Sequence, residues 1–141
     1  MNTDMRAKLR ALLLIHEGYK LKPYPDTAGK ITNGIGRNLT DRGLLPVEVD
    51  LCFANDTDYF YNALCDTYSW YPSLDEARQI AMVDLAYMGM KRLSGFTEML
   101  GAMALKNYNT AADELLNSDY AVEVGQRAQD LAVIIRTGTL P

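Results

Sequence analysis

Residues 17–36 of the chain read EGYKLKPYPDTAGKITNGIG. The stretch begins with Glu17, places Asp26 nine positions later and Thr32 six positions beyond that. Its prolines and glycines rule out a continuous helix, and short runs such as residues 30–32 predict a small hairpin or three-stranded sheet. The sequence therefore predicts a glutamate at a helix end, facing two polar side chains on a small sheet.

Helical patterns flank this stretch on both sides. Apolar residues recur at helical spacing between Thr3, the predicted N-cap, and Gly18, which ends the first helix. Pro46 suits the first position of a long helix to about Tyr68. Shorter helices are predicted after a capping box at residues 73–76 through the apolar segment 80–90, from Asn109 to Leu116, and from Asp119 to about Ile135. The fold class is thus predicted to be α+β and mostly helical.

Length and composition indicate one globular domain. The chain has 141 residues, of which 48% are hydrophobic and 23% charged, so it can bury a core and is not disordered. No apolar run approaches the roughly 20 residues that span a bilayer. The N-terminus also lacks the order of a signal peptide, so we expect synthesis in the cytoplasm without stable membrane insertion.

Cysteine and histidine usage points away from disulfides and metals. Cys52 and Cys65 fall in the predicted long helix, where their separation corresponds to about 20 Å, so both are expected to be reduced. His16, the only histidine, cannot form a zinc site alone and is expected to be a packed or surface residue. We therefore expect no cofactor.

Charge is distributed unevenly along the chain. Residues 1–43 contain eight Lys or Arg and four Asp or Glu, whereas residues 44–90 contain one and eight. A basic cleft near the N-terminus suits an anionic substrate, although scattered solvated charge explains the same pattern. The net charge of -4 argues against a general nucleic-acid-binding protein.

Two carboxylates beside a polar cleft are what glycoside hydrolysis requires. Glu17, at a helix end and partly screened by apolar neighbours, suits the proton donor, and Asp26 in an open turn suits the ionised partner. Thr32 supplies a hydroxyl that orients water. On spacing alone, the plainer interpretation of a capping Asp26 and a solvated Glu17 is favoured.

The motifs together resemble the phage-type lysozymes. Glu17-Gly18, Asp26-Thr27 and Thr32-x-Gly34-Ile35-Gly36 stand at that family's spacings. Later segments follow in the family's order, among them Met88-Gly89, Gly95-Phe96-Thr97, Arg127-Ala128 and Arg136-Thr137-Gly138-Thr139. The resemblance covers nearly the whole chain.

The resemblance implies a two-lobed lysozyme-like fold within one domain, residues 1–141. Its parts are an N-terminal lobe at about residues 12–50 with a small β-sheet, a connecting helix at about 46–68, and a helical C-terminal lobe at about 69–141 on which the first helix packs. It also implies an endolysin muramidase that cleaves the β-1,4 bond between N-acetylmuramic acid and N-acetylglucosamine in bacterial peptidoglycan and so lyses cells.

Carried over position by position, the resemblance makes Glu17 the general acid, with Asp26 and Thr32 positioning and activating water. It implies substrate contacts at these residues: Gly36, Asn38, Tyr87, Phe96 and Arg127. A histidine that the family has after the glycine run is Arg37 here, and we predict that it pairs with Asp56. Asp84, inside an apolar helix, is predicted to be satisfied by an arginine or a helix N-terminus rather than to be catalytic.

Two alternatives remain open. One is a catalytically silent lysozyme-like module that binds glycan or a protein partner, and the other is a lytic transglycosylase, which cleaves the same bond without water. The expected partner is bacterial peptidoglycan, with no nucleic acid. We expect a monomer that accumulates in the host cytoplasm and reaches the cell wall through a separate pore-forming holin.

Overall fold

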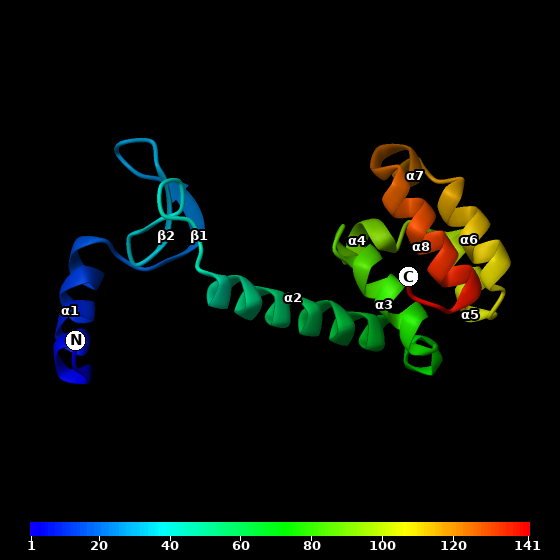
Figure 1. The fold of residues 1–141 in the computed structure, drawn as a ribbon, viewed down its shortest axis with the longest axis horizontal. Helices are drawn as coiled ribbons and strands as arrows, with labels where there is room; N and C mark the ends of the chain where they lie inside the picture. The colour runs from blue at the N-terminus through cyan, green and yellow to red at the C-terminus, as the bar shows by residue number, and fades with distance from the viewer. The chain divides into compact units, whose positions relative to one another are not determined.

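The computed structural model describes residues 1–141 and divides into two compact units. Unit 1 comprises Met1–Cys52 and unit 2 comprises Phe53–Pro141, so the division falls inside one long helix, α2 (Pro46–Thr67). The predicted fold class is confirmed, because most residues are helical and a three-stranded sheet lies near the N-terminus (Figure 1). The prediction that the first helix packs on the C-terminal lobe stays a prediction.

Unit 1 begins with α1 (Thr3–His16). Its N-cap is Asn2, whose side chain accepts a hydrogen bond of 2.8 Å from the Met5 N–H, so the predicted Thr3 cap is wrong by one residue. The helix ends as predicted, because Gly18 adopts a φ of +75°, which favours glycine. His16 is exposed, in keeping with a surface residue.

The predicted sheet follows α1 and has the order β1-β2-β3, with all neighbours antiparallel. Its strands are β1 (Lys20–Pro25), β2 (Ile31–Gly34) and β3 (Arg37–Asn38). In the register, Thr32 of β2 stands opposite Tyr24 of β1 and Asn38 of β3. Thr32 is therefore central in the sheet, which explains why it is the one buried polar residue.

The long helix α2 has nearly the predicted bounds. Pro46 is its first residue, and it has no internal glycine or proline. Cys52 and Cys65 both lie in it and both are free, as predicted. None of the helices combines the length and apolarity needed to cross a membrane.

Unit 2 contains the remaining helices around one apolar core. They are the short 3-10 helix η1 (Tyr71–Ser73) and the α-helices α3 (Glu76–Ala86), α4 (Met90–Leu93), α5 (Thr97–Ala104), α6 (Tyr108–Leu116), α7 (Asp119–Val124) and α8 (Gln126–Thr137). Figure 1 shows α8 beside α6, and their buried faces meet in the core. The largest fully buried side chains are Leu64, Tyr71, Met82, Leu85, Leu93, Met99, Met103, Leu115 and Ile135.

The sequence predicted α3, α6 and the segment of α7 and α8, but it did not predict η1, α4 or α5, and it misplaced several helix ends, since α3 ends at Ala86 rather than near Met90. Asp75, rather than Ser73, caps α3, since its side chain accepts from the Arg78 N–H. Asn107, not Asn109, caps α6 in the same way.

The helix predicted from Asp119 to about Ile135 is two helices. Gly125, with a φ of +56° and a ψ of -115°, interrupts it, because this conformation cannot continue a right-handed helix.

Candidate active site

Glu17 is the C-cap residue of α1, at the point where the chain turns into the sheet. Its backbone N–H donates to the Leu13 carbonyl at 2.8 Å, which fixes the backbone from which the carboxyl projects. The Glu17 side chain is exposed. The apolar residues of unit 1 therefore do not screen its carboxyl from water as the sequence predicts. The predicted acid is thus an accessible carboxyl on a fixed helix end.

The glycine run lies directly against Glu17. A Cβ atom built on Gly36 would stand 2.9 Å from Cγ of Glu17, 3.0 Å from its Cδ and 3.1 Å from its Oε2. Gly36 also has a φ of +70°, a conformation that disfavours other residues. Glycine is therefore required here twice, for its backbone conformation and because the glutamate occupies the space of a side chain.

Asp26 forms a tight turn between β1 and β2. Its Oδ1 accepts the N–H groups of Ala28 at 2.9 Å and Lys30 at 2.8 Å, and its own N–H donates to the Lys30 carbonyl at 2.8 Å. These bonds leave Oδ2 without a protein partner. Asp26 therefore stabilises a turn, as a capping residue does, and is at the same time a fixed carboxylate with one free oxygen. A structural role for Asp26 and a catalytic role do not exclude each other.

Thr32 lies one register position from this turn, with 4% of its surface exposed. Its hydroxyl donates to the Lys30 carbonyl at 3.3 Å, a long bond that holds the hydroxyl only weakly. Lys30 thus connects Asp26 and Thr32, since its backbone N–H donates to Asp26 and its carbonyl accepts from Thr32. Glu17, Asp26 and Thr32 all lie in unit 1, at a helix end, in a turn and in a strand, and the prediction that they face one another stays a prediction.

Arg37 does not make the predicted pair with Asp56. Its Nη2 lies 2.5 Å from Oε2 of Glu48, its Nη1 donates to Oε1 at 3.1 Å, and its Nε donates to the Gly43 carbonyl at 2.9 Å. Glu48 lies in the first turn of α2, about 12 Å along the helix from Asp56. The guanidinium of Arg37 therefore pairs with Glu48 at the start of the helix and not with Asp56. The prediction of an Arg37–Asp56 pair is therefore wrong.

Glu48 has a second contact, since its Oε2 accepts the Leu45 N–H at 2.7 Å. This hydrogen bond, followed by the charge of Arg37, lowers the pKa of Glu48 against the opposing effect of desolvation. Sequence patterns alone did not single out Glu48. An acid two positions after a helix-starting proline is the signal that would have found it.

Asn38, a predicted substrate contact, is engaged within unit 1. Its Nδ2 donates to Oδ2 of Asp41 at 3.0 Å, while its Oδ1 accepts the Asp41 N–H at 2.9 Å. Asp41 in turn pairs with Lys30 at 2.9 Å, and this hydrogen bond raises the pKa of Lys30 and lowers that of Asp41. A substrate contact at Asn38 would therefore have to use the groups that Asp41 leaves free.

The other predicted substrate contacts belong to unit 2. Tyr87 and Arg127 line one groove of about 650 Å³, whereas Phe96 lines a different hollow of about 450 Å³. Arg127 pairs with Asp84, which confirms that this carboxylate is satisfied by an arginine. Asp84 is half-exposed rather than buried. The structure thus places Tyr87 and Arg127 together and Phe96 apart from them.

The sequence profile of phage lysozymes matches residues 15–133 of this chain, a range that includes the glutamate, aspartate, threonine and glycine positions described above. The chain belongs to the phage lysozyme family. Two relatives from Dictyostelium discoideum, "Probable T4-type lysozyme 2" and "Probable T4-type lysozyme 1", are each 25% identical to it. Each alignment covers 96% of this chain and 98% of the relative.

Family membership confirms the resemblance seen in the sequence. It supports a lysozyme-like function, the hydrolysis of peptidoglycan, for a fold that is mostly helical with a small sheet. The predicted site lies within the matched range. The roles of its individual residues are matters of proposal.

Proposed function

We propose that this protein is a muramidase that hydrolyses the β-1,4 bond between N-acetylmuramic acid and N-acetylglucosamine in bacterial peptidoglycan. The observation that carries the proposal is the close approach of the Glu17 carboxyl to Gly36 at one end of β2, in the same small sheet whose other end carries the turn with Asp26. An exposed carboxyl on a fixed helix end, packed against a glycine, suits an acid that must reach a substrate. Family membership supports the same activity.

The proposed reaction needs one acid and one activated water. Glu17 donates its proton to the glycosidic oxygen as the bond from that oxygen to the anomeric carbon breaks. Asp26 accepts a proton from water through its free oxygen, and Thr32 helps to orient that water. The hydroxide bonds to the anomeric carbon and gives a new reducing end.

The wider setting is also a proposal. We infer that the protein is an endolysin that acts as a monomer on the bacterial cell wall after release from the host cytoplasm by a separate holin. Gly36, Asn38, Tyr87, Phe96 and Arg127 are the proposed substrate contacts. The support for this setting is the family, although the two relatives named as probable T4-type lysozymes come from Dictyostelium discoideum and not from a phage.

Product analysis tests the reaction type. Purified peptidoglycan would be digested in water enriched in oxygen-18, and the released fragments analysed by mass spectrometry. Hydrolysis predicts reducing N-acetylmuramic acid ends that carry the heavy oxygen. Fragments with 1,6-anhydro ends would instead show a lytic transglycosylase, and binding to peptidoglycan without any new ends would show a silent module.

A further inference from the structure

Asp84 holds Arg127 by both its side chain and its backbone. Nε of Arg127 donates to Oδ1 at 2.9 Å, and Nη2 donates to the Asp84 carbonyl at 3.1 Å and lies 2.8 Å from Oδ1. These contacts join α3 to the first turn of α8. The guanidinium is therefore fixed in position, which a solvated arginine is not.

One edge of the fixed guanidinium stays free. Asp84 engages Nε and Nη2, whereas Nη1 has no partner within unit 2, and 49% of the Arg127 side chain is exposed. Asp84, Arg127 and Tyr87 all line the same groove, together with the rings of Phe53, Tyr61 and Tyr71. The groove thus offers N–H donors beside aromatic surface, a combination that suits a sugar.

The charges that line the groove indicate which kind of acceptor group on a ligand the N–H donors of Arg127 bind. Asp84 offsets the charge of Arg127, and two further carboxylates, Asp58 and Glu76, also line the groove. Three acids against one cation disfavour a free carboxylate as ligand. A neutral acceptor, such as the acetamido carbonyl or a hydroxyl of a sugar, meets no such opposition.

This inference rests on the proposed function. We propose that Asp84 is a positioning and specificity-determining residue: it fixes and neutralises Arg127, so that the groove accepts a neutral group of the glycan and disfavours the free carboxylates of the peptide stems. Asp84 acts through Arg127 and takes no part in proton transfer. Its loss should therefore change KM and substrate preference more than kcat.

The test uses two peptidoglycan preparations, one with free stem carboxylates and one in which they have been converted to amides. The Asp84→Asn variant keeps a side-chain oxygen for Arg127 but removes the compensating charge. We expect the preference for amidated over free peptidoglycan, measured as the ratio of kcat/KM values, to fall by roughly fivefold at low salt. The value of kcat should stay within about twofold, because Glu17 is untouched.

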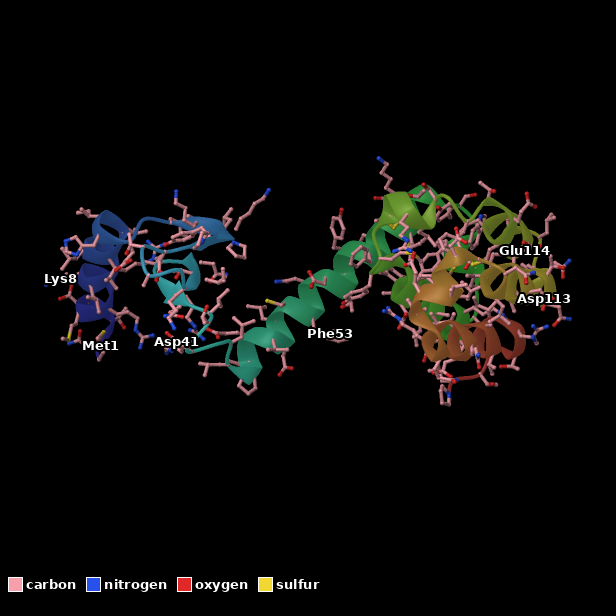
Figure 2. The ribbon with its side chains drawn as sticks, turned by 90° about the horizontal axis from the view of Figure 1, so that it is seen from above. Met1, Lys8, Asp41, Phe53, Asp113 and Glu114 are labelled. Carbon is pink, nitrogen blue, oxygen red and sulfur yellow. The ribbon has the colours of Figure 1, made fainter.

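Asp113→Asn is the matched control. Asp113 of α6 accepts a hydrogen bond of 2.8 Å from Arg136, which lies at the opposite end of α8 from Arg127. Asp113 lies outside the groove and is labelled on the helical unit in Figure 2. This variant should leave the substrate preference unchanged. Asp84→Glu, which keeps the charge and displaces the contact, should raise KM for both substrates and leave their ratio unchanged.

Two failures are distinguishable. A wild type that releases no fragments from either preparation contradicts the proposed function and removes the basis of this inference with it. An active wild type whose preference is unaffected by Asp84→Asn, or altered equally by Asp113→Asn, overturns the inference alone. Circular dichroism of each variant separates these results from unfolding.

Discussion

Units 1 and 2 are organised by different interactions. Every buried apolar side chain lies in unit 2, between Leu64 and Ile135, whereas the one buried side chain of unit 1 is the polar Thr32. Unit 1 instead holds its shape by backbone pairing, by the turn at Asp26 and by the Arg37–Glu48 pair. The proposed chemistry belongs to the unit whose geometry depends on directional bonds and glycines.

This difference has a physical basis. Apolar burial stabilises strongly but is not directional, so it sets positions only through packing. Hydrogen bonds contribute less to stability and fix atoms within a few tenths of an ångström. We therefore expect apolar truncations to affect mainly the stability of unit 2, and small changes at glycines to affect mainly activity through unit 1.

The largest expected effect is on the core. Leu85 is fully buried in α3, and Leu85→Ala should lower the free energy of unfolding by about 2–5 kcal/mol through lost burial and a cavity. Urea unfolding followed by circular dichroism and by the fluorescence of Trp70 would measure it. The same substitution at Leu21 of β1, which is 80% exposed, should cost less than about 0.5 kcal/mol. Equal losses at the two positions would contradict the comparison.

Gly36→Ala should reduce activity more than stability. The added Cβ needs the space of the Glu17 side chain, so the carboxyl must move, and a displacement of about 1 Å can cost a factor of about 100 in rate. Release of reducing ends from peptidoglycan measures the effect.

Gly43→Ala is the control for backbone strain alone. Gly43 also has a positive φ, of +65°, but a Cβ there would meet nothing within 4 Å. Both variants should lose stability of about 1–3 kcal/mol, and only the first should lose most of its rate. Similar rates in both would show that Glu17 tolerates displacement.

The smallest expected effect is the acid sensitivity of unit 1. Because the Leu45 N–H, with Arg37, lowers the pKa of Glu48 in the folded state, the ionised form is favoured there. The resulting stability is fully present above the unfolded pKa, near 4.3, and is lost as the pH falls through the folded value. Glu48→Gln should reduce this loss.

Hydrogen exchange of the amides of residues 31–38, at pH 6 and at acidic pH, would measure the effect. Asp50→Asn, at an exposed carboxylate two positions further along α2, should leave the acid sensitivity unchanged. If exchange in the Glu48→Gln variant accelerates with acid as much as in wild type, another group controls the acid response.

The sequence predicted the features that depend on local rules. The positive-φ turn at Gly18, the start of α2 at Pro46 and the sheet at residues 20–38 follow from glycine, proline and short β-runs, whose conformational preferences act within a few residues. Glu17, Asp26 and Thr32 lie in one short segment, so their common place in unit 1 follows from the sequence, whereas their mutual approach stays a prediction.

The features that the sequence missed depend on competition between partners. Sequence patterns did not distinguish Glu48 from Asp56 as the partner of Arg37, which also donates to the Gly43 carbonyl. The break at Gly125 was hidden because an isolated glycine is tolerated within many helices. The partner of Asp84 could be predicted as a type of residue, but not identified as Arg127, because the two lie 43 positions apart.

The most direct test of the central claim is the rate at which Glu17→Gln releases new reducing ends from purified peptidoglycan. The substitution keeps the size and shape of the side chain but removes the proton that Glu17 donates. We predict a loss of at least about 100-fold relative to wild type, with an unchanged circular dichroism spectrum and near wild-type activity in Asp50→Asn. Full activity in Glu17→Gln would contradict the assignment of the general acid and, with it, this account of unit 1.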